Sequence, residues 1–226
     1  MKFVLLILLV VAARAETLHY AINWPSGLSL GEATLTSSGI AASSGPNNFA
    51  GHWSFDLAID ASLPGFALRD HYKSSAGAGL CSEQLDKTTM HGKHQSEERI
   101  VFDQHNSTVT RESVNGGGKS QISVSTCSRD ALAFLQFARS ELAQGRIAPE
   151  QDVIFGGSYQ VRLQYTGAQT VNVGERQIAT DHMLATIKGP ASDITVEIYF
   201  ARDAARTPVL AKVPVELGTF TVELSR

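Results

Sequence analysis

The sequence has few charged side chains and no excess of basic ones. Charged residues make up 18% of its 226 residues, with 22 acidic side chains, 19 basic ones and a formal net charge of -3. Removing a leader through Ala15 would take away Lys2 and Arg14, leaving 17 basic side chains (19 − 2) and a net charge of −5 (17 − 22). Nucleic acids and anionic membrane surfaces select basic patches, so this composition argues against both as partners.

Long hydrophobic runs are missing as well. The apolar run over residues 3–13 has eleven residues, fewer than the roughly 20 that a transmembrane helix needs. It follows the basic start Met1-Lys2 and ends in Ala13-Arg14-Ala15, which has the small-x-small form of a cleavage site. We therefore predict a signal peptide over residues 1–15, a single β-rich domain over residues 16–226 and no membrane span after cleavage. A protein of this kind is periplasmic or secreted.

Cysteine is scarce, with only Cys81 and Cys127 in the chain. Their spacing excludes a CxxC redox or zinc motif. In an oxidising compartment, two cysteines favour one structural disulfide, and two separate thiols are the alternative. Closing so long a loop would stabilise the fold by roughly 4 kcal/mol on the chain-entropy model.

Apolar residues at every second position recur through most of the chain. This alternation indicates antiparallel strands with one buried and one solvated face, and turn residues such as Gly45-Pro46-Asn47 and Gly189-Pro190 separate the runs. We count ten to twelve strands in this way. The alternating positions are Leu18, Tyr20, Ile22 and Trp24; Trp53, Phe55, Leu57 and Ile59; Tyr159, Val161, Leu163 and Tyr165; Ile194, Val196, Ile198 and Phe200; and Phe220, Val222 and Leu224.

One segment has a helical period instead. Over residues 129–144, apolar side chains recur at steps of three and four, with Ser128 or Asp130 as the N-cap and Gly145 as the stop signal. The predicted fold is mainly β: a curved antiparallel sheet, forming a half-barrel or open barrel, with one amphipathic helix packed against its concave face. Alternation does not tell whether the interior is filled by side chains or open to a ligand.

The histidines form no recognisable metal or catalytic motif. His91 and His94 lie three residues apart across a predicted turn, and no cysteine or acidic residue at ligand spacing completes a metal site. Asp181 precedes His182 and is placed to orient it, but no nucleophile is indicated beside the pair. We therefore predict no metal site and no cofactor.

The acidic residues form no recognisable catalytic pair either. Glu97 and Glu98 are neighbours in a predicted strand, so they point to opposite faces and are expected to be solvated. The large aromatic residues, Phe66 and Phe220 among them, are best interpreted as core. The candidates for lining an apolar ligand site are Trp24, Trp53, Phe55, Phe134 and Phe200.

Several segments, in their order along the chain, resemble a known family. Residues 18–24 (LHYAINW), 97–103 (EERIVFD), 128–135 (SRDALAFL) and 198–200 (IYF) resemble the bacterial family called domain of unknown function 3108. The family brings no established activity and no catalytic residues. The resemblance implies an exported β-rich domain. Its fold would be similar in style to that of periplasmic lipoprotein carriers, whose curved half-barrel holds acyl chains. A likeness in fold gives an expectation about function and no more.

The chain departs from the family pattern at the helix. Ala131 stands where proline is common, and Cys127 just before it suggests a subgroup that carries a disulfide. The resulting hypothesis is a non-enzymatic envelope protein that binds a lipid, an acyl chain or an envelope protein. The alternative is a periplasmic hydrolase whose site the sequence does not reveal.

Overall fold

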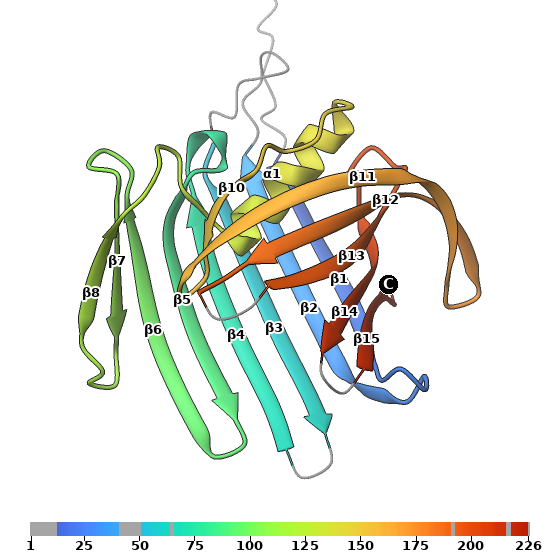
Figure 1. Ribbon diagram of the computed structural model, residues 1–226, viewed down its shortest axis with the longest axis horizontal. Helices are drawn as coiled ribbons and strands as arrows, with labels where there is room; N and C mark the ends of the chain where they lie inside the picture. The colour runs from blue at the N-terminus through green and yellow to red at the C-terminus, as the bar shows by residue number, and fades with distance from the viewer. Residues whose placement is uncertain (1–12, 41–50, 64–65, 191–192, 216–217, 226) are drawn as a thin grey trace, which may run out of the picture.

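The strands form one curved sheet, fifteen strands wide, wrapped around an α-helix (Figure 1). The structure is a computed structural model that describes residues 13–40, 51–63, 66–190, 193–215 and 218–225. The strand order is β8-β7-β6-β5-β4-β3-β2-β1-β15-β14-β13-β12-β11-β10-β9. The elements are β1 (Ala13–Asn23), β2 (Ser29–Ile40), β3 (Trp53–Leu63), β4 (Phe66–Ala76), the 3-10 helix η1 (Ala78–Leu80), β5 (Ser82–His91), β6 (His94–Asp103), β7 (Thr108–Ser113), β8 (Lys119–Ser123), β9 (Arg129–Asp130), α1 (Ala131–Ala143), β10 (Gln151–Ile154), β11 (Ser158–Val173), β12 (Arg176–Lys188), β13 (Asp193–Ala201), β14 (Pro208–Val215) and β15 (Gly218–Leu224).

The prediction of a curved, mainly β fold with one helix on the concave face is confirmed. The strand count was too low because β9 has two residues and all five residues of β8 are exposed, so neither shows alternation. Residues 1–12 of the predicted signal peptide lie outside the described residues, and Ala13–Ala15 begin β1, opposite Ser38–Ile40 of β2. The division into leader and mature domain stays a prediction.

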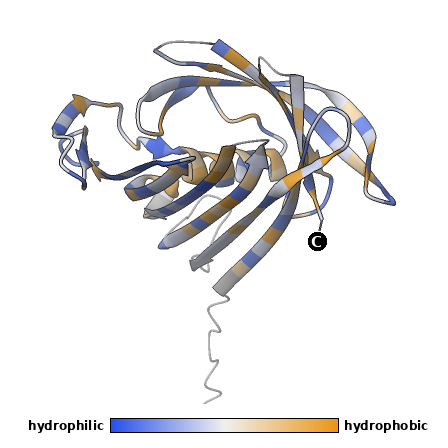
Figure 2. Ribbon diagram, turned by 90° about the horizontal axis from the view of Figure 1, so that it is seen from below, coloured by the Kyte–Doolittle hydropathy of each residue, from blue (hydrophilic) through white to orange (hydrophobic). Residues whose placement is uncertain are grey.

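Alternation decides which side chains form the core. The inward-facing positions of β1 to β6, such as Leu18, Leu35, Phe55 and Leu85, are buried in one cluster on the concave face. The convex face carries mostly polar side chains, and Figure 2 shows apolar and polar residues alternating along the strands, with the helix inside the curve. The helix adds Leu132 and Ala133 to the same cluster. Among the described residues, no helix combines the length and the apolar character that a membrane crossing requires.

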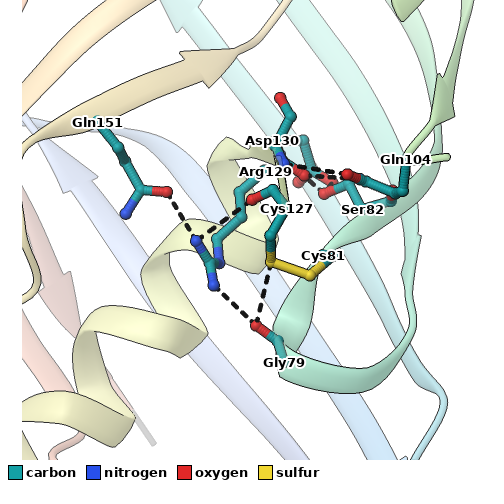
Figure 3. The surroundings of a disulfide bond; sticks show 9 residues. Gly79, Cys81, Ser82, Gln104, Cys127, Arg129, Asp130 and Gln151 are labelled. Carbon is teal, nitrogen blue, oxygen red and sulfur yellow. Dashed lines mark hydrogen bonds between the residues drawn. A yellow bond between two sulfur atoms is a disulfide. The ribbon is translucent and has the colours of Figure 1, made fainter. Parts of the chain in front are cut away.

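The curved sheet returns on itself at β9, which meets the start of β5 without forming a closed barrel. The Ser82 N–H donates to the Ser128 carbonyl at 3.0 Å, and Gln104 Nε2 donates to the carbonyls of both residues. The predicted disulfide Cys81–Cys127 is confirmed and spans the same junction, with a Cα–Cα distance of 4.6 Å (Figure 3). One backbone hydrogen bond, the Gln104 side chain and the disulfide therefore hold this seam together, while β6, β7 and β8 continue beyond it.

The carboxylate of Asp130 lies at the centre of the seam and is fully buried. Oδ2 accepts from the hydroxyls of Ser74 and Ser82, each at 2.6 Å, and Oδ1 accepts from the N–H groups of Leu132 and Ala133 at 2.8 and 3.1 Å. Burial raises the pKa of Asp130, and these four hydrogen bonds act against that rise by stabilising the charged form. One side chain thus caps α1 and joins it to β4 and β5.

We predict that Asp130→Ala lowers the free energy of unfolding by about 3 kcal/mol, because it removes the helix cap and leaves two buried hydroxyls without an acceptor. Urea unfolding followed by circular dichroism measures the change. Asp152→Ala, at an exposed position in β10, is the matched control and should stay within about 0.5 kcal/mol of the parent. Equal losses in the two variants would contradict the role assigned to Asp130.

Candidate functional site

The inward side chains become more exposed with distance from the helix. On β1, Leu18 and Tyr20 are buried and Ile22 is partly exposed; on β3, Phe55 is buried and Ile59 is partly exposed. The same change occurs along β13, where Phe200 is buried and the preceding inward residues are not. We call the partly exposed apolar set the open concave face: Ile22, Leu57, Ile59, Leu68, Val196, Ile198 and Val222.

Strand register makes the open concave face continuous. Directly opposed residues in antiparallel strands point to the same side of a sheet. Ile22 opposes Val222, which opposes Ala211, which in turn opposes Ile198. This row crosses β1, β15, β14 and β13, and Ile22, Leu57, Ile59 and Val222 pack against the buried core. The concave side therefore carries an apolar surface that the helix does not fully cover.

Polar side chains occupy the same face on β4 to β6. Asp70, which is buried, accepts a hydrogen bond from the Tyr72 hydroxyl at 2.8 Å and lies 3.0 Å from Nε2 of His91. Burial, with Asp70 adding to it, raises the pKa of Tyr72. His94 is the cross-strand partner of His91. Within the described residues, no group of three or more His, Cys, Asp or Glu side chains is placed to hold a metal ion.

A second polar group lies beside the first. Lys87 Nζ is 3.5 Å from Glu98 Oε2 and 4.8 Å from the centre of the Phe155 ring, and Arg111 donates to Glu98 Oε1. Burial raises the pKa of Glu98, but the hydrogen bond from Arg111 and the charge of Lys87 outweigh it, so the pKa is lowered. The expectation that Glu98 is solvated was wrong, because the turn after β10, with Phe155 and Gly156, lies against Lys87 and Glu98. We call Asp70, Tyr72, Lys87, His91 and Glu98 the polar wall.

His182 belongs to a different cluster, on the other side of the sheet from Met183. Its Nδ1 lies 2.6 Å from the Thr166 hydroxyl, and its ring stacks on Tyr199 with centroids 4.4 Å apart. Tyr199 donates to Glu197 at 2.6 Å. These contacts attach the long β11–β12 hairpin to β13.

The expected pairing of Asp181 with His182 was wrong. Successive strand residues point to opposite faces, and Asp181 instead accepts from Arg206 Nη1 at 2.6 Å and lies 3.2 Å from Arg202 Nε. Asp181 therefore holds the connection between β13 and β14, and His182 takes its orientation from Thr166 on β11.

A cavity of about 390 Å³ lies between α1, β1 and the β13–β14 connection. Trp53 lines it, and so does the buried Arg139, whose guanidinium donates to both carboxylate oxygens of Glu16 at 2.7 and 2.9 Å. Arg139 Nε also donates to the carbonyls of Ala205 and Arg206. The guanidinium is thus occupied by groups of this chain and joins β1 to the β13–β14 connection.

The five aromatic candidates do not line one common space. Phe55, Phe134 and Phe200 are buried, and Phe134 belongs to a separate cluster with Val153 and Val161. Trp53 is next to the cavity, whereas Trp24 packs edge-on against Phe220 with centroids 4.9 Å apart. Apart from Leu68, the aliphatic residues of the open concave face were visible in the alternation but were not singled out. Burial, which sequence does not show, separates them from the core.

A curved antiparallel sheet around one helix, with a partly uncovered concave side, is the architecture of a β-barrel-like protein. The solved structure of a beta-barrel-like protein of domain of unknown function DUF1849 from Brucella abortus has this fold, with a TM-score of 0.57 and 7% identity over 93% of this chain and 95% of that chain. At this identity the likeness concerns the fold alone. The chain belongs to the family "Protein of unknown function (DUF3108)", whose profile matches residues 18–225. No match was found among curated proteins.

We predict that Glu98 contributes stability that acid removes. Because its pKa is lower in the folded protein, the contribution is present above the usual glutamate pKa of about 4.3 and is lost as the pH falls through the folded-state pKa. The difference in free energy of unfolding between the parent and Glu98→Gln should therefore be largest near neutral pH and shrink below about pH 4.

Urea unfolding at a series of pH values measures this difference. Glu97→Gln is the matched control, since Glu97 is the adjacent residue on the opposite face. A pH dependence as large for Glu97→Gln as for Glu98→Gln would contradict the assignment to the Lys87–Glu98–Arg111 group.

Proposed function

We propose that this protein binds an amphiphile, such as a lipid or a fatty acid, with its acyl chain on the open concave face. The observation that carries the proposal is the row of partly exposed apolar residues from Ile22 to Ile198 on the concave side. Covering apolar surface stabilises a complex by about 25 cal/mol per Å², so an acyl chain would gain affinity from surface that the helix leaves uncovered.

The polar wall supplies a place for the head of such a ligand. His91 is half exposed at the edge of this wall and is held by Asp70, while the partly buried Lys87 and Glu98 are paired with each other. One side of the concave face is therefore apolar and the other polar. An amphiphile matches that division better than a purely apolar molecule, because its head retains hydrogen-bond partners.

We further propose that the protein is exported and works in the periplasm or outside the cell. The Cys81–Cys127 disulfide is typical of oxidising compartments. The sequence of residues 1–15 supports the same placement through its basic start, short apolar run and small-x-small end. An exported β-scaffold that binds amphiphiles would act as a carrier or sensor of envelope lipids, and it needs no cofactor and no catalytic residues.

Ligand binding is tested with a fatty acid that carries an environment-sensitive fluorophore. Ile59→Trp should weaken binding about tenfold, a loss of about 1.4 kcal/mol, because the larger ring occupies the open concave face. The neighbouring Ala58 is exposed and points to the convex side, so Ala58→Trp is the matched control and should bind as the parent does. Thermal unfolding of both variants verifies that each is folded.

Native mass spectrometry of the protein purified from a periplasm without detergent adds an independent readout. A lipid-sized adduct that is reduced in Ile59→Trp supports the proposal. Failure of the parent to bind the fluorescent fatty acid, or equal weakening in both variants, overturns it and redirects attention to an envelope protein as the partner.

A further inference from the structure

His91 stands where the apolar and the polar parts of the concave face meet. Across the β4–β5 ladder it opposes Leu68, a residue of the open concave face, and across the β5–β6 ladder it opposes His94. Directly opposed residues of antiparallel strands lie on the same side of a sheet. The three residues therefore form one row that is apolar on β4 and ionisable on β5 and β6. A ligand that lies over Leu68 brings its next group to His91.

An aromatic ring and a neighbouring turn fix the position of His91. The centroid of the Phe66 ring lies 6.1 Å from that of the imidazole, and the Gly92 N–H donates to the Ala67 carbonyl at 2.7 Å. The start of β4 and the β5–β6 turn are thus in contact, at the lower end of the sheet in Figure 1. Phe66 is 40% exposed, so the expectation that it is a core residue was wrong.

A buried carboxylate orients the imidazole of His91. The side chain of Asp70 is only 8% exposed, and its two oxygens lie 3.0 and 3.2 Å from Nε2 of His91. An ionised carboxylate can only accept hydrogen bonds, so Nε2 carries a proton. The other ring nitrogen, Nδ1, makes no hydrogen bond to the residues that the structure describes, and the His91 side chain is 46% exposed. Nδ1 is therefore the nitrogen that a ligand can reach.

The carboxylates of the polar wall already have their partners in this chain. Asp70 is bound by the imidazole of His91 and accepts from the Tyr72 hydroxyl at 2.8 Å. Glu98 accepts from Arg111. A cationic head would have to displace a donor of the protein from one of these carboxylates, at the cost of a hydrogen bond that already exists.

The groups around His91 favour an anion instead. Residues 89–96 include Lys93 and two histidines, and their sequence has no acidic residue. The charged residues closest to this point on the neighbouring strands, other than Asp70, are Arg69 on β4 and Glu97 on β6. Both point to the convex face, because successive strand residues alternate between the two sides. Once protonated, His91 would add its charge to that of Lys93 in the adjacent turn.

We propose that the head of the ligand is a carboxylate bound at Nδ1 of His91, and that His91 takes up one proton from the solvent as the complex forms. The imidazolium then donates from Nδ1 to the ligand and from Nε2 to Asp70, so its charge lies between two carboxylates. Histidine can change its charge in this way because it ordinarily titrates between about pH 5 and 8. This inference rests on the proposed function, since it names the head of the same ligand.

Calorimetric titration with decanoate and with decanol, which share one chain length, tests the proposal. Decanoate should bind more tightly than decanol near pH 6.5. Above about pH 7, its Kd should rise by up to about tenfold for each pH unit, because the complex holds one proton more than the separate partners. Titrations near pH 8 in buffers of different ionisation enthalpy should show that proton being taken up. The Kd of decanol should not change with pH.

His91→Gln should bind decanoate and decanol with similar Kd at every pH, because glutamine cannot take up the proton. His71→Gln is the matched control. His71 has a similarly exposed side chain and lies 2.8 Å from Asp56, but it points to the convex face. This variant should keep the pH dependence of the parent. Thermal unfolding verifies that both variants are folded.

The outcomes separate this inference from the proposed function. If the parent binds decanoate and decanol with equal Kd at every pH, the carboxylate head is overturned and the proposed function stands. If the parent binds neither ligand, the proposed function is overturned, and the inference falls with it. A pH dependence that persists in His91→Gln but disappears in His94→Gln would overturn the role of His91, because it would place the proton on β6.

Discussion

The hydrogen bonds to the buried carboxyl group of Asp130 join the helix and β9 to the opposite part of the sheet. A wide antiparallel sheet does not have to meet itself, and here β9 and β5 are held together by a backbone hydrogen bond, by side chains and by one disulfide. Asp130 caps the helix and accepts hydrogen bonds from β4 and β5 with the same group. The position of α1 on the concave face and the closeness of the two parts of the sheet therefore have a common cause. A buried carboxyl group of this kind is tolerated only because four donors replace its water.

These contacts are concentrated at the end of the molecule that contains the helix. The disulfide, the helix start and the Arg139–Glu16 pair all lie toward the helix-containing end, where the inward side chains are buried. The other end is held mainly by strand pairing, and its inward side chains are partly exposed. Regions with few buried contacts open more readily than densely packed ones. The protein thus combines a firmly packed end with a looser one, and the open concave face lies at the looser end.

Local patterns in the sequence were sufficient to predict the strands and the helix, but not the contacts between them. Alternation identified the strands and the inward face, the three- and four-residue steps identified the helix, and Asp130 was recognised as a possible cap. Its hydroxyl partners lie 48 and 56 residues away and leave no local signal. His91 likewise gains its partner Asp70 from a strand 21 residues earlier.

Strand order also determines when the sheet can be completed. Every strand pairs with a sequence neighbour except at the centre, where β1 pairs with β15. The sheet therefore consists of two meanders, β1 to β8 and β10 to β15, with β9 added in parallel to β10 across α1. The ladder that unites the meanders joins Tyr20 to Leu224, 204 residues later (224 − 20). Contacts of such long range form slowly because they close a large loop. Until the last strand has been delivered, β1 and β14 each present an unpaired edge to other chains. During its synthesis the chain thus passes through a stage with two open strand edges, and β15, with seven residues, covers both at once.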